Sequence, residues 1–266
     1  MVGKVFATTL AMTMLWCAPG FGADAPKSAD DLIGKYVDAI GGRKAIDSIH
    51  TIRFVGKTIV GGGIEAPLTV SKMRPNKIRT EIEFQGMKLV TAFDGTTGWM
   101  ISPFAGKTDP EKMGEAQLKI LLDQADFDGP LIDYKKKGNK VELMGEDEIE
   151  GTPTYKLKVT KKSGSVEYYH LDKEYFILLA RTSKFEFQGS EIESEEHFGD
   201  YKPVGGRLFA HSIESKAGMM GGGTVTFDKI EVNPKIDSNR FVMPKVKPES
   251  KKEDAPKPDG KKKGKD

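Results

Sequence analysis

Residues Lys77 to Gly95 read KIRTEIEFQGMKLVTAFDG, and this stretch decides the fold. From Ile78 to Phe84, apolar or β-branched residues occupy every second position, and charged residues fill the positions between them. Gln85-Gly86 predicts a tight turn, and DGTTG predicts another turn before Trp99. A period of two with one apolar and one polar face is typical of antiparallel strands joined by short turns. The stretch therefore predicts part of a β-meander.

The same rhythm continues on both sides of this stretch. Upstream it runs through TIRFVGKTIV and PLTVSKMR, and downstream it resumes at KVELMGEDEI and continues to TVTFDKIEVN. Turns that contain Gly, Pro or short polar residues separate these segments. We expect about ten to twelve strands in one antiparallel sheet, without a repeat of fixed period.

Helices are predicted at the start and in the middle of the chain. Ser28 and Asp31 have the spacing of a helix cap, apolar residues then recur at helical spacing, and Gly41-Gly42 ends the pattern. A short second helix is expected up to Ile49, and Glu111 to Ala125 predicts a third. Because the apolar face of the sheet is too large to be left bare, we expect the helices to cover it. The predicted fold class is α+β, a strongly curved antiparallel β-sheet (an incomplete or half barrel) with helices covering the concave apolar face.

The two ends of the chain differ from the middle. Residues 1–23 have a lysine followed by a short apolar run and small residues, which predicts a cleaved signal peptide and export. The alternatives to a cleaved signal peptide are an N-terminal membrane anchor that is never cut and a lipoprotein signal in which Cys17 is lipidated. Residues 246–266 hold eight Lys and five acidic residues without aromatic or β-branched residues from position 247 onward, and we expect a disordered tail there. The tail is either solubilising or weakly attracted to anionic lipid. Residues 24–245 are left as one domain.

No catalytic, metal-binding or cofactor-binding motif emerges from the sequence. Two Gly-Lys-Thr triplets lack the earlier glycine of a phosphate-binding loop. His170, Asp172 and Glu174 alternate, but Asp, Lys and Glu are disfavoured in strands, so LDKEY is interpreted as a turn. Glu195 and His197 belong to an acidic run that is typical of a solvated strand face. We therefore expect no enzyme activity, metal or cofactor. A hydrolase that uses these residues is the competing hypothesis.

Three arginines lie on polar strand faces by the alternation: Arg53, Arg74 and Arg79. Solvation and cross-strand pairing with acids are the simple interpretation. One of them could instead turn inward to meet the headgroup of a ligand, and the alternation does not select which one.

The order of these features resembles a known family. An export signal, an opening amphipathic helix, FDGTTGW at 93–99, a mid-chain helix, YYHLDKEYFILLAR at 168–181 and FDKIEVNPKIDSNRFVMP at 227–244 together resemble the outer-membrane lipoprotein-sorting superfamily, the LolA, LolB and LppX-like half-barrel proteins. The resemblance covers roughly residues 30–244. It implies an incomplete barrel, closed by helices, whose apolar cavity holds acyl chains during transfer through the periplasm.

The resemblance and the alternation together define a candidate cavity. Its residues are Ile52, Phe54, Ile82, Phe84, Leu89, Phe93 and Trp99 from strands and Leu118, Leu121 and Leu122 from the helix, with Tyr155, Leu157 and Val159 as further members. For each residue the alternative is ordinary core packing. The expected function is a periplasmic carrier of lipid or lipoprotein acyl chains to the outer membrane. We expect transient membrane contact, partner proteins in the two membranes, and no nucleic acid. An envelope sensor that binds a protein partner on the same fold is the alternative.

Overall fold

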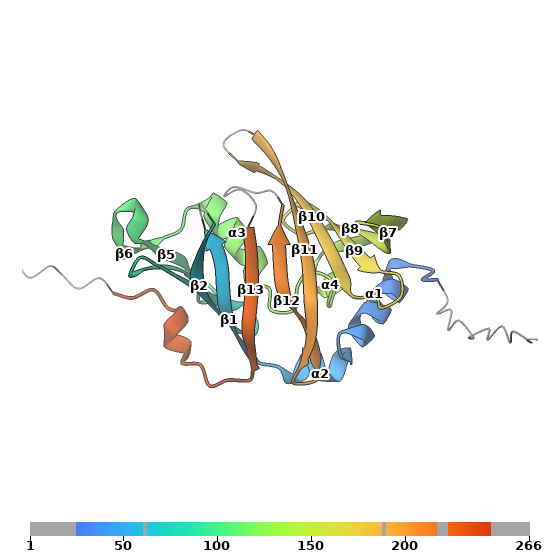
Figure 1. The fold of residues 1–266 in the computed structure, drawn as a ribbon, viewed down its shortest axis with the longest axis horizontal. Coiled ribbons are helices and arrows are strands. Elements are labelled where there is room, and N and C mark those ends of the chain that lie inside the picture. Colours follow the sequence, from blue (N-terminus) through green and yellow to red (C-terminus); the bar gives the residue numbers. More distant parts are fainter. Residues whose placement is uncertain (1–24, 61–62, 188–189, 217–222, 246–266) are drawn as a thin grey trace, which may run out of the picture.

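The computed structural model describes residues 25–60, 63–187, 190–216 and 223–245. The predicted signal peptide and the predicted tail lie outside these residues. The described strands form one 13-stranded sheet in the order β6-β5-β4-β3-β2-β1-β13-β12-β11-β10-β9-β8-β7 (Figure 1). All neighbouring strands are antiparallel. The prediction of a single antiparallel sheet is confirmed, with slightly more strands than expected.

The sheet consists of two meanders. The first runs from the centre of the sheet to one edge, and the second runs from the other edge back to the centre. In the first, β1 to β6 extend outward from the centre and comprise Thr51–Val60, Ile64–Met73, Lys77–Phe84, Met87–Phe93, Gly98–Ser102 and Lys107–Lys112. In the second, β7 to β13 run from the far edge back to the centre and comprise Lys140–Ile149, Thr152–Thr160, Val166–Asp172, Leu178–Phe187, Ser190–Val204, Arg207–Ser215 and Gly223–Val232. The first and last strands therefore pair in the middle of the sheet.

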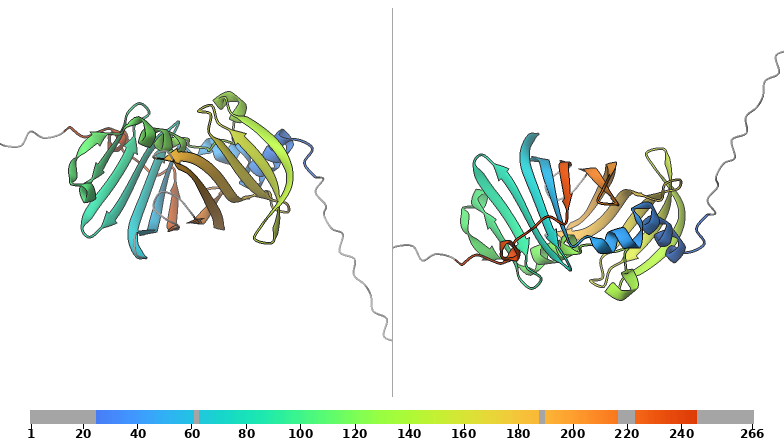
Figure 2. Two further views of the ribbon diagram at one scale, coloured as in Figure 1. Left: turned by 90° about the horizontal axis from the view of Figure 1, so that it is seen from above. Right: turned by 90° about the horizontal axis from the view of Figure 1, so that it is seen from below.

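The helices lie on the concave side of the curved sheet (Figure 2). They are α1 (Ala29–Ala39), α2 (Gly42–Ser48), α3 (Glu115–Ala125) and the short α4 (Tyr134–Lys137), and two 3₁₀ turns occur at η1 (Pro103–Ala105) and η2 (Ser238–Phe241). The predicted cap of α1 is confirmed, because the Asp31 N–H donates to the Ser28 hydroxyl at 3.1 Å.

The mid-chain helix begins later than the sequence predicts. Glu111 lies in β6, where it pairs with Met100 of β5, and α3 starts only at Glu115. The sequence of β6 is polar and contains Pro110, which disfavours a central strand. As an edge strand, β6 tolerates a residue without an N–H, and this placement explains the difference.

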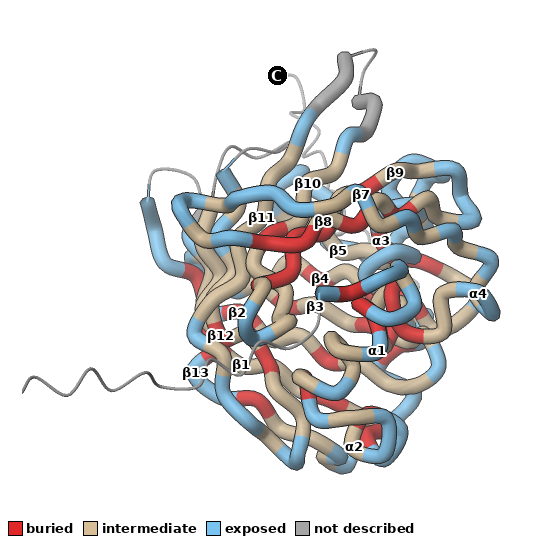
Figure 3. Tube along the Cα trace, turned by 90° about the vertical axis from the view of Figure 1, so that its right-hand side faces the viewer, coloured by how far each residue is buried: buried red, intermediate tan, exposed pale blue. Residues whose placement is uncertain are grey.

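The core forms between the sheet and the helices (Figure 3). Leu32 and Ile33 of α1 pack on the strand residues Tyr155, Leu157 and Val159, all of which are buried. At the other end of the sheet, Leu121 and Ala125 of α3 pack on Ile78 and Phe93. None of the described helices is long and apolar enough to cross a membrane.

One close approach holds the two meanders together. The β1–β13 register shifts between Val55 and Gly56, and a Cβ atom at Gly56 would lie 1.9 Å from the Thr226 carbonyl oxygen. Only a residue without a side chain fits this position, so Gly56 permits the central pairing.

We expect Gly56→Ala to lower the free energy of unfolding by about 2–3 kcal/mol, because the backbone must move to relieve the overlap. Urea denaturation measures the change. Gly34→Ala is the matched control: Gly34 is exposed within α1 and a Cβ there meets nothing within 4 Å, so helix propensity should raise the stability by up to about 1 kcal/mol. Equal effects of the two substitutions would contradict the role of Gly56.

Candidate functional site

The concave face of the central strands is apolar. Cross-strand pairing places Ile52 and Phe54 of β1 on the same face as Ile230 and Val232 of β13. The pairs Ile78–Phe93 and Ile82–Leu89 continue this face across β3 and β4. Phe54, Phe209 and Phe227 form an aromatic group on it, with ring centroids 6.0 Å (Phe54–Phe209) and 5.0 Å (Phe54–Phe227) apart.

Much of this face is only partly covered. Ile52 and Phe93 are buried, whereas other apolar residues on the same face retain intermediate exposure: Phe54, Val70, Ile82, Phe84, Leu89, Ile213 and Val225. The buried residues are those that pack against α3 or the loop after it, or lie beside α2. The helices thus leave part of the apolar concave face accessible.

Helix α3 sits directly on strand β5. A Cβ atom at Gly98 would lie 2.6 Å from Leu118 Cδ1 and 3.4 Å from Leu121 Cδ2. Met113, just before the helix, donates its N–H to the Gly98 carbonyl oxygen at 2.9 Å. The absence of a side chain at Gly98 therefore lets α3 approach the sheet closely.

Eight of the ten predicted cavity residues lie at the concave face, and two do not. Trp99 is on the opposite, convex face, where it packs with Val90 and Ala92 under the C-terminal segment. Its Nε1 donates to the Phe241 carbonyl oxygen at 2.7 Å. Leu122 is 44% exposed and does not belong to the apolar contact of α3. The ligand role of the other eight stays a prediction.

A polar loop follows α3 and carries one buried aromatic side chain. Residues Asp126 to Pro130, termed here the Phe127 loop, place Phe127 among the buried apolar residues of β1, β2, β12 and β13. Arg74 holds the loop: its Nη2 donates to Asp128 Oδ1 at 2.7 Å, and its Nη1 pairs with Asp128 Oδ2. The Arg74 guanidinium also lies 4.4 Å from the centre of the Phe127 ring. Of the three arginines left open above, Arg74 is therefore the one that turns inward.

Two further cations lie beside this loop. Lys72 Nζ donates to the Asp126 carbonyl oxygen at 2.8 Å, and burial lowers the pKa of Lys72 to about 8. Arg207 stacks over Phe209 at 5.1 Å, and its nearest carboxylate oxygen, Asp128 Oδ1, is 3.8 Å from Nη1. The sequence carries a signal for both residues, since each occupies an apolar position of its alternating strand: Lys72 follows Leu68 and Val70, and Arg207 precedes Phe209.

A separate ionic network lies on the concave side of β9 to β11. Arg181 pairs with Glu196, and Tyr169 donates its hydroxyl to Glu167 Oε2 at 2.7 Å. Lys161 completes the network at 2.6 Å from Glu167 Oε1 and joins it to α3 through Asp123 at 2.9 Å. These groups satisfy one another, so the network fixes this half of the sheet relative to α3.

The predicted turn after β9 is confirmed, but His170 is not part of it. Asp172 ends β9, and its Oδ1 accepts from the N–H groups of Glu174 at 2.8 Å and Tyr175 at 2.6 Å. His170 lies within the strand, is 4% exposed and has no hydrogen-bond partner at Nδ1. Burial lowers its pKa. Asp172 therefore acts as a turn residue, and the triplet is not assembled as one site.

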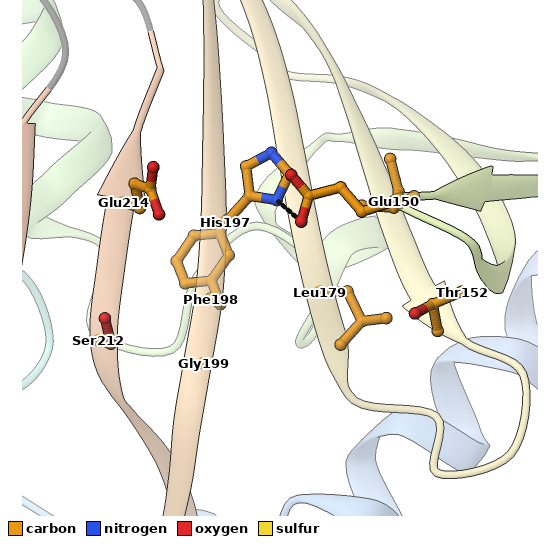
Figure 4. Close-up of a pocket in the computed structure, with 9 residues that line it drawn as sticks. Glu150, Thr152, Leu179, His197, Phe198, Gly199, Ser212 and Glu214 are labelled. Atoms are coloured by element: carbon orange, nitrogen blue, oxygen red, sulfur yellow. Dashed lines mark ion pairs between the residues drawn. The ribbon is translucent and has the colours of Figure 1, made fainter.

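His197 lines a hollow of 280 Å³ on the convex face (Figure 4). The hollow lies between β11, β12 and the β7–β8 turn, and its other polar residues include Glu150, Ser212 and Glu214. His197 Nε2 contacts Glu195, and its Nδ1 is 4.0 Å from Glu150 Oε2. Among the described residues, no group of three or more His, Cys, Asp or Glu is arranged to hold a metal ion. These contacts join the β7–β8 turn to the convex face.

No protein-family model matches the chain, and a sequence comparison with characterised proteins finds no match. Solved structures do match. A DUF1329 family protein from Desulfovibrio piger aligns with a TM-score of 0.56 at 11% identity, over 80% of this chain and 97% of its own. A LolA superfamily protein from Nitrosomonas europaea aligns with a TM-score of 0.55 at 12% identity, over 81% of this chain and 97% of its own.

The chain has a LolA-like fold. A Vibrio parahaemolyticus domain assigned to outer-membrane lipoprotein sorting supports the same conclusion, with a TM-score of 0.55 at 12% identity over 80% of this chain and 97% of its own. At such identities the likeness establishes the fold alone. In this LolA-like sheet the helices cover the concave face only in part.

We expect the cost of burying Lys72 to depend on pH. Its folded-state pKa is lowered from 10.5 to about 8. Between these values the unfolded chain keeps the proton that the folded chain has lost, so raising the pH stabilises the wild type by at most about 1.4 kcal/mol per pH unit. Below pH 8 both states are charged and the cost is complete.

Urea denaturation of the wild type and Lys72→Met at pH 7.5 and pH 10 measures this effect. The free energy of unfolding of the variant, relative to wild type, should fall as the pH rises. Lys44→Met, at an exposed position of α2, controls for the loss of a lysine. A pH-independent difference for Lys72→Met would contradict the burial of its charge.

Proposed function

We propose that this protein is a carrier or binding protein for acyl chains of lipids or lipoproteins, and that it acts in the bacterial envelope in transfer to the outer membrane. The partly exposed apolar concave face carries this proposal. A surface of this kind, in the concavity of a rigid sheet, is typical of sites for apolar ligands. The assignment of the similar Vibrio domain to outer-membrane lipoprotein sorting supports the same class of ligand.

The partial cover suits a ligand that must be released. An acyl chain gains about 0.8 kcal/mol for each methylene that it buries, so complete burial of a long chain would make release slow. Phe54, Ile82 and Leu89 offer contact while they remain partly open to solvent. Helix α3 and the Phe127 loop, which connect to the sheet through Leu118 and Arg74, are the elements whose displacement would enlarge the site.

A matched pair of strand variants tests the proposal. Ile82 lies on the concave face and Val55 on the convex face, and both have intermediate exposure. We expect Ile82→Gln to weaken palmitate binding at least 10-fold, because the ligand would meet a polar side chain, whereas Val55→Gln should leave binding unchanged.

Displacement of a fluorescent fatty acid from the delipidated protein, with native mass spectrometry for stoichiometry, measures the affinities. Thermal melting of both variants verifies that they remain folded. Absence of palmitate uptake by the wild type, or equal loss of affinity in the two variants, would contradict acyl-chain binding at the concave face.

A further inference from the structure

The cations around the Phe127 loop are not evenly matched by carboxylates. Asp128 accepts two hydrogen bonds from Arg74, and Asp126 Oδ1 accepts one from Lys137 Nζ at 2.6 Å. These two acids are thereby engaged. Lys72 reaches only a carbonyl oxygen of the loop, and Arg207 reaches a carboxylate only at 3.8 Å, beyond hydrogen-bond distance.

Arg207 is the least satisfied of these groups. Its Nε and Nη1 are both buried and have no hydrogen-bond partner, and the side chain is only 11% exposed. A buried cationic group without hydrogen bonds is costly, and such a group in a native structure calls for an explanation such as an unseen ion or ligand.

Lys72 and Arg207 also affect each other. Burial is the main cause of the lowered pKa of Lys72, and the nearby positive charge of Arg207 lowers it further. Both cations lie at the Phe127 loop, Lys72 at the Asp126 carbonyl oxygen and Arg207 beside Asp128. An anion bound between them would relieve the repulsion and supply the missing hydrogen bonds.

The surroundings of this pair are apolar on one side. Lys72 Nζ is 6.0 Å from the Phe127 ring centre and Arg207 lies over Phe209, and both rings belong to the apolar cluster that includes Ile52 and Phe227. On the other side, Arg74 and Asp126 keep 24% and 27% side-chain exposure. The pair therefore lies where the apolar concave face meets solvent.

We propose that Lys72 and Arg207 bind the anionic headgroup, a carboxylate or phosphate, of an amphiphile whose acyl chain lies along the concave face. This inference rests on the proposed function and specifies the ligand class: singly anionic or more highly charged amphiphiles are favoured over neutral ones. Arg74 is already bonded to Asp128 and serves to position the loop beside the headgroup.

The test compares two ligands of one chain length, dodecanoate and its neutral methyl ester, by displacement of a fluorescent probe from the full chain. Wild type should bind dodecanoate at least 10-fold more tightly than the ester. Arg207→Gln should reduce dodecanoate affinity at least 10-fold and change ester affinity less than 2-fold. Lys72→Met should act in the same direction, and it provides the readout if Arg207→Gln does not fold.

Arg53→Gln is the matched control, because Arg53 is on the convex face and pairs with Glu231 at 3.1 Å. It should bind both ligands as the wild type does. Equal affinity of the wild type for dodecanoate and its ester would overturn the headgroup site while leaving acyl-chain binding intact. Binding of neither ligand would instead overturn the proposed function.

A third arm identifies the source of the anion. Inorganic phosphate, and butyrate as a carboxylate with a short chain, should displace dodecanoate only at concentrations at least 100-fold higher than dodecanoate itself requires. Displacement by phosphate or butyrate at the concentrations effective for dodecanoate would show a site for free small anions and overturn the assignment to an amphiphile headgroup.

Discussion

The pairing of β1 with β13 is the contact on which the rest of the structure depends. Without it, β1 to β6 and β7 to β13 would be two separate meanders, each with one additional open edge. The pairing joins residues about 180 positions apart in the sequence, such as Ile52 and Val232. A bulge at Gly56 allows it and adds local twist. The curvature of the sheet, and hence the existence of a concave side, follows from this continuous arrangement of twisted strands.

The helices then cover the concave side unevenly. The pair α1–α2 lies over β7 to β9 and near β12, while α3 lies over β3 to β5. Between them the Phe127 loop crosses the centre of the sheet, and only Phe127 itself is inserted there. A loop covers less apolar surface than a helix, so the central strands keep partly exposed apolar residues. The partly exposed apolar surface therefore results from the way in which the connection between β6 and β7 crosses the sheet.

Local patterns in the sequence predict the elements well where local physics determines them. The Ser28 cap of α1, the turn at Asp172 and the alternation in β3 are set by neighbouring residues, and all three appear in the structure. The start of α3 was missed because Glu111 is held by pairing with Met100, which no local pattern reveals. A polar segment with proline becomes a strand only because a neighbouring edge is available to it.

The face to which a side chain belongs was predicted less reliably, for a different reason. Apolar character does not identify the concave face when part of the convex face is also covered. Trp99 lies under η2, and Phe241, which is fully buried, covers it from a segment 142 residues later. Conversely, Lys72 and Arg207 interrupt otherwise apolar alternation, and a charge in such a position is the more informative sign. A charged side chain at a core-facing position of a strand needs a counter-charge, either from the protein or from a bound ligand.

The two halves of the proposed site divide affinity and selectivity between them. A palmitoyl chain that buries about half of its methylenes gains about 6 kcal/mol, which alone corresponds to weak binding. An anion that reaches two partly desolvated cations adds a charge-assisted contact. Because this contact is directional, it also fixes which end of the ligand lies at the Phe127 loop.

Asp128 is the competing anion already present, held by Arg74 and 3.8 Å from Arg207. A headgroup that enters beside Asp128 would meet repulsion from it and attraction from Arg207. In the proposed site the position of the loop would therefore set how tightly the headgroup is held, and displacement of the loop would turn a retained ligand into a released one.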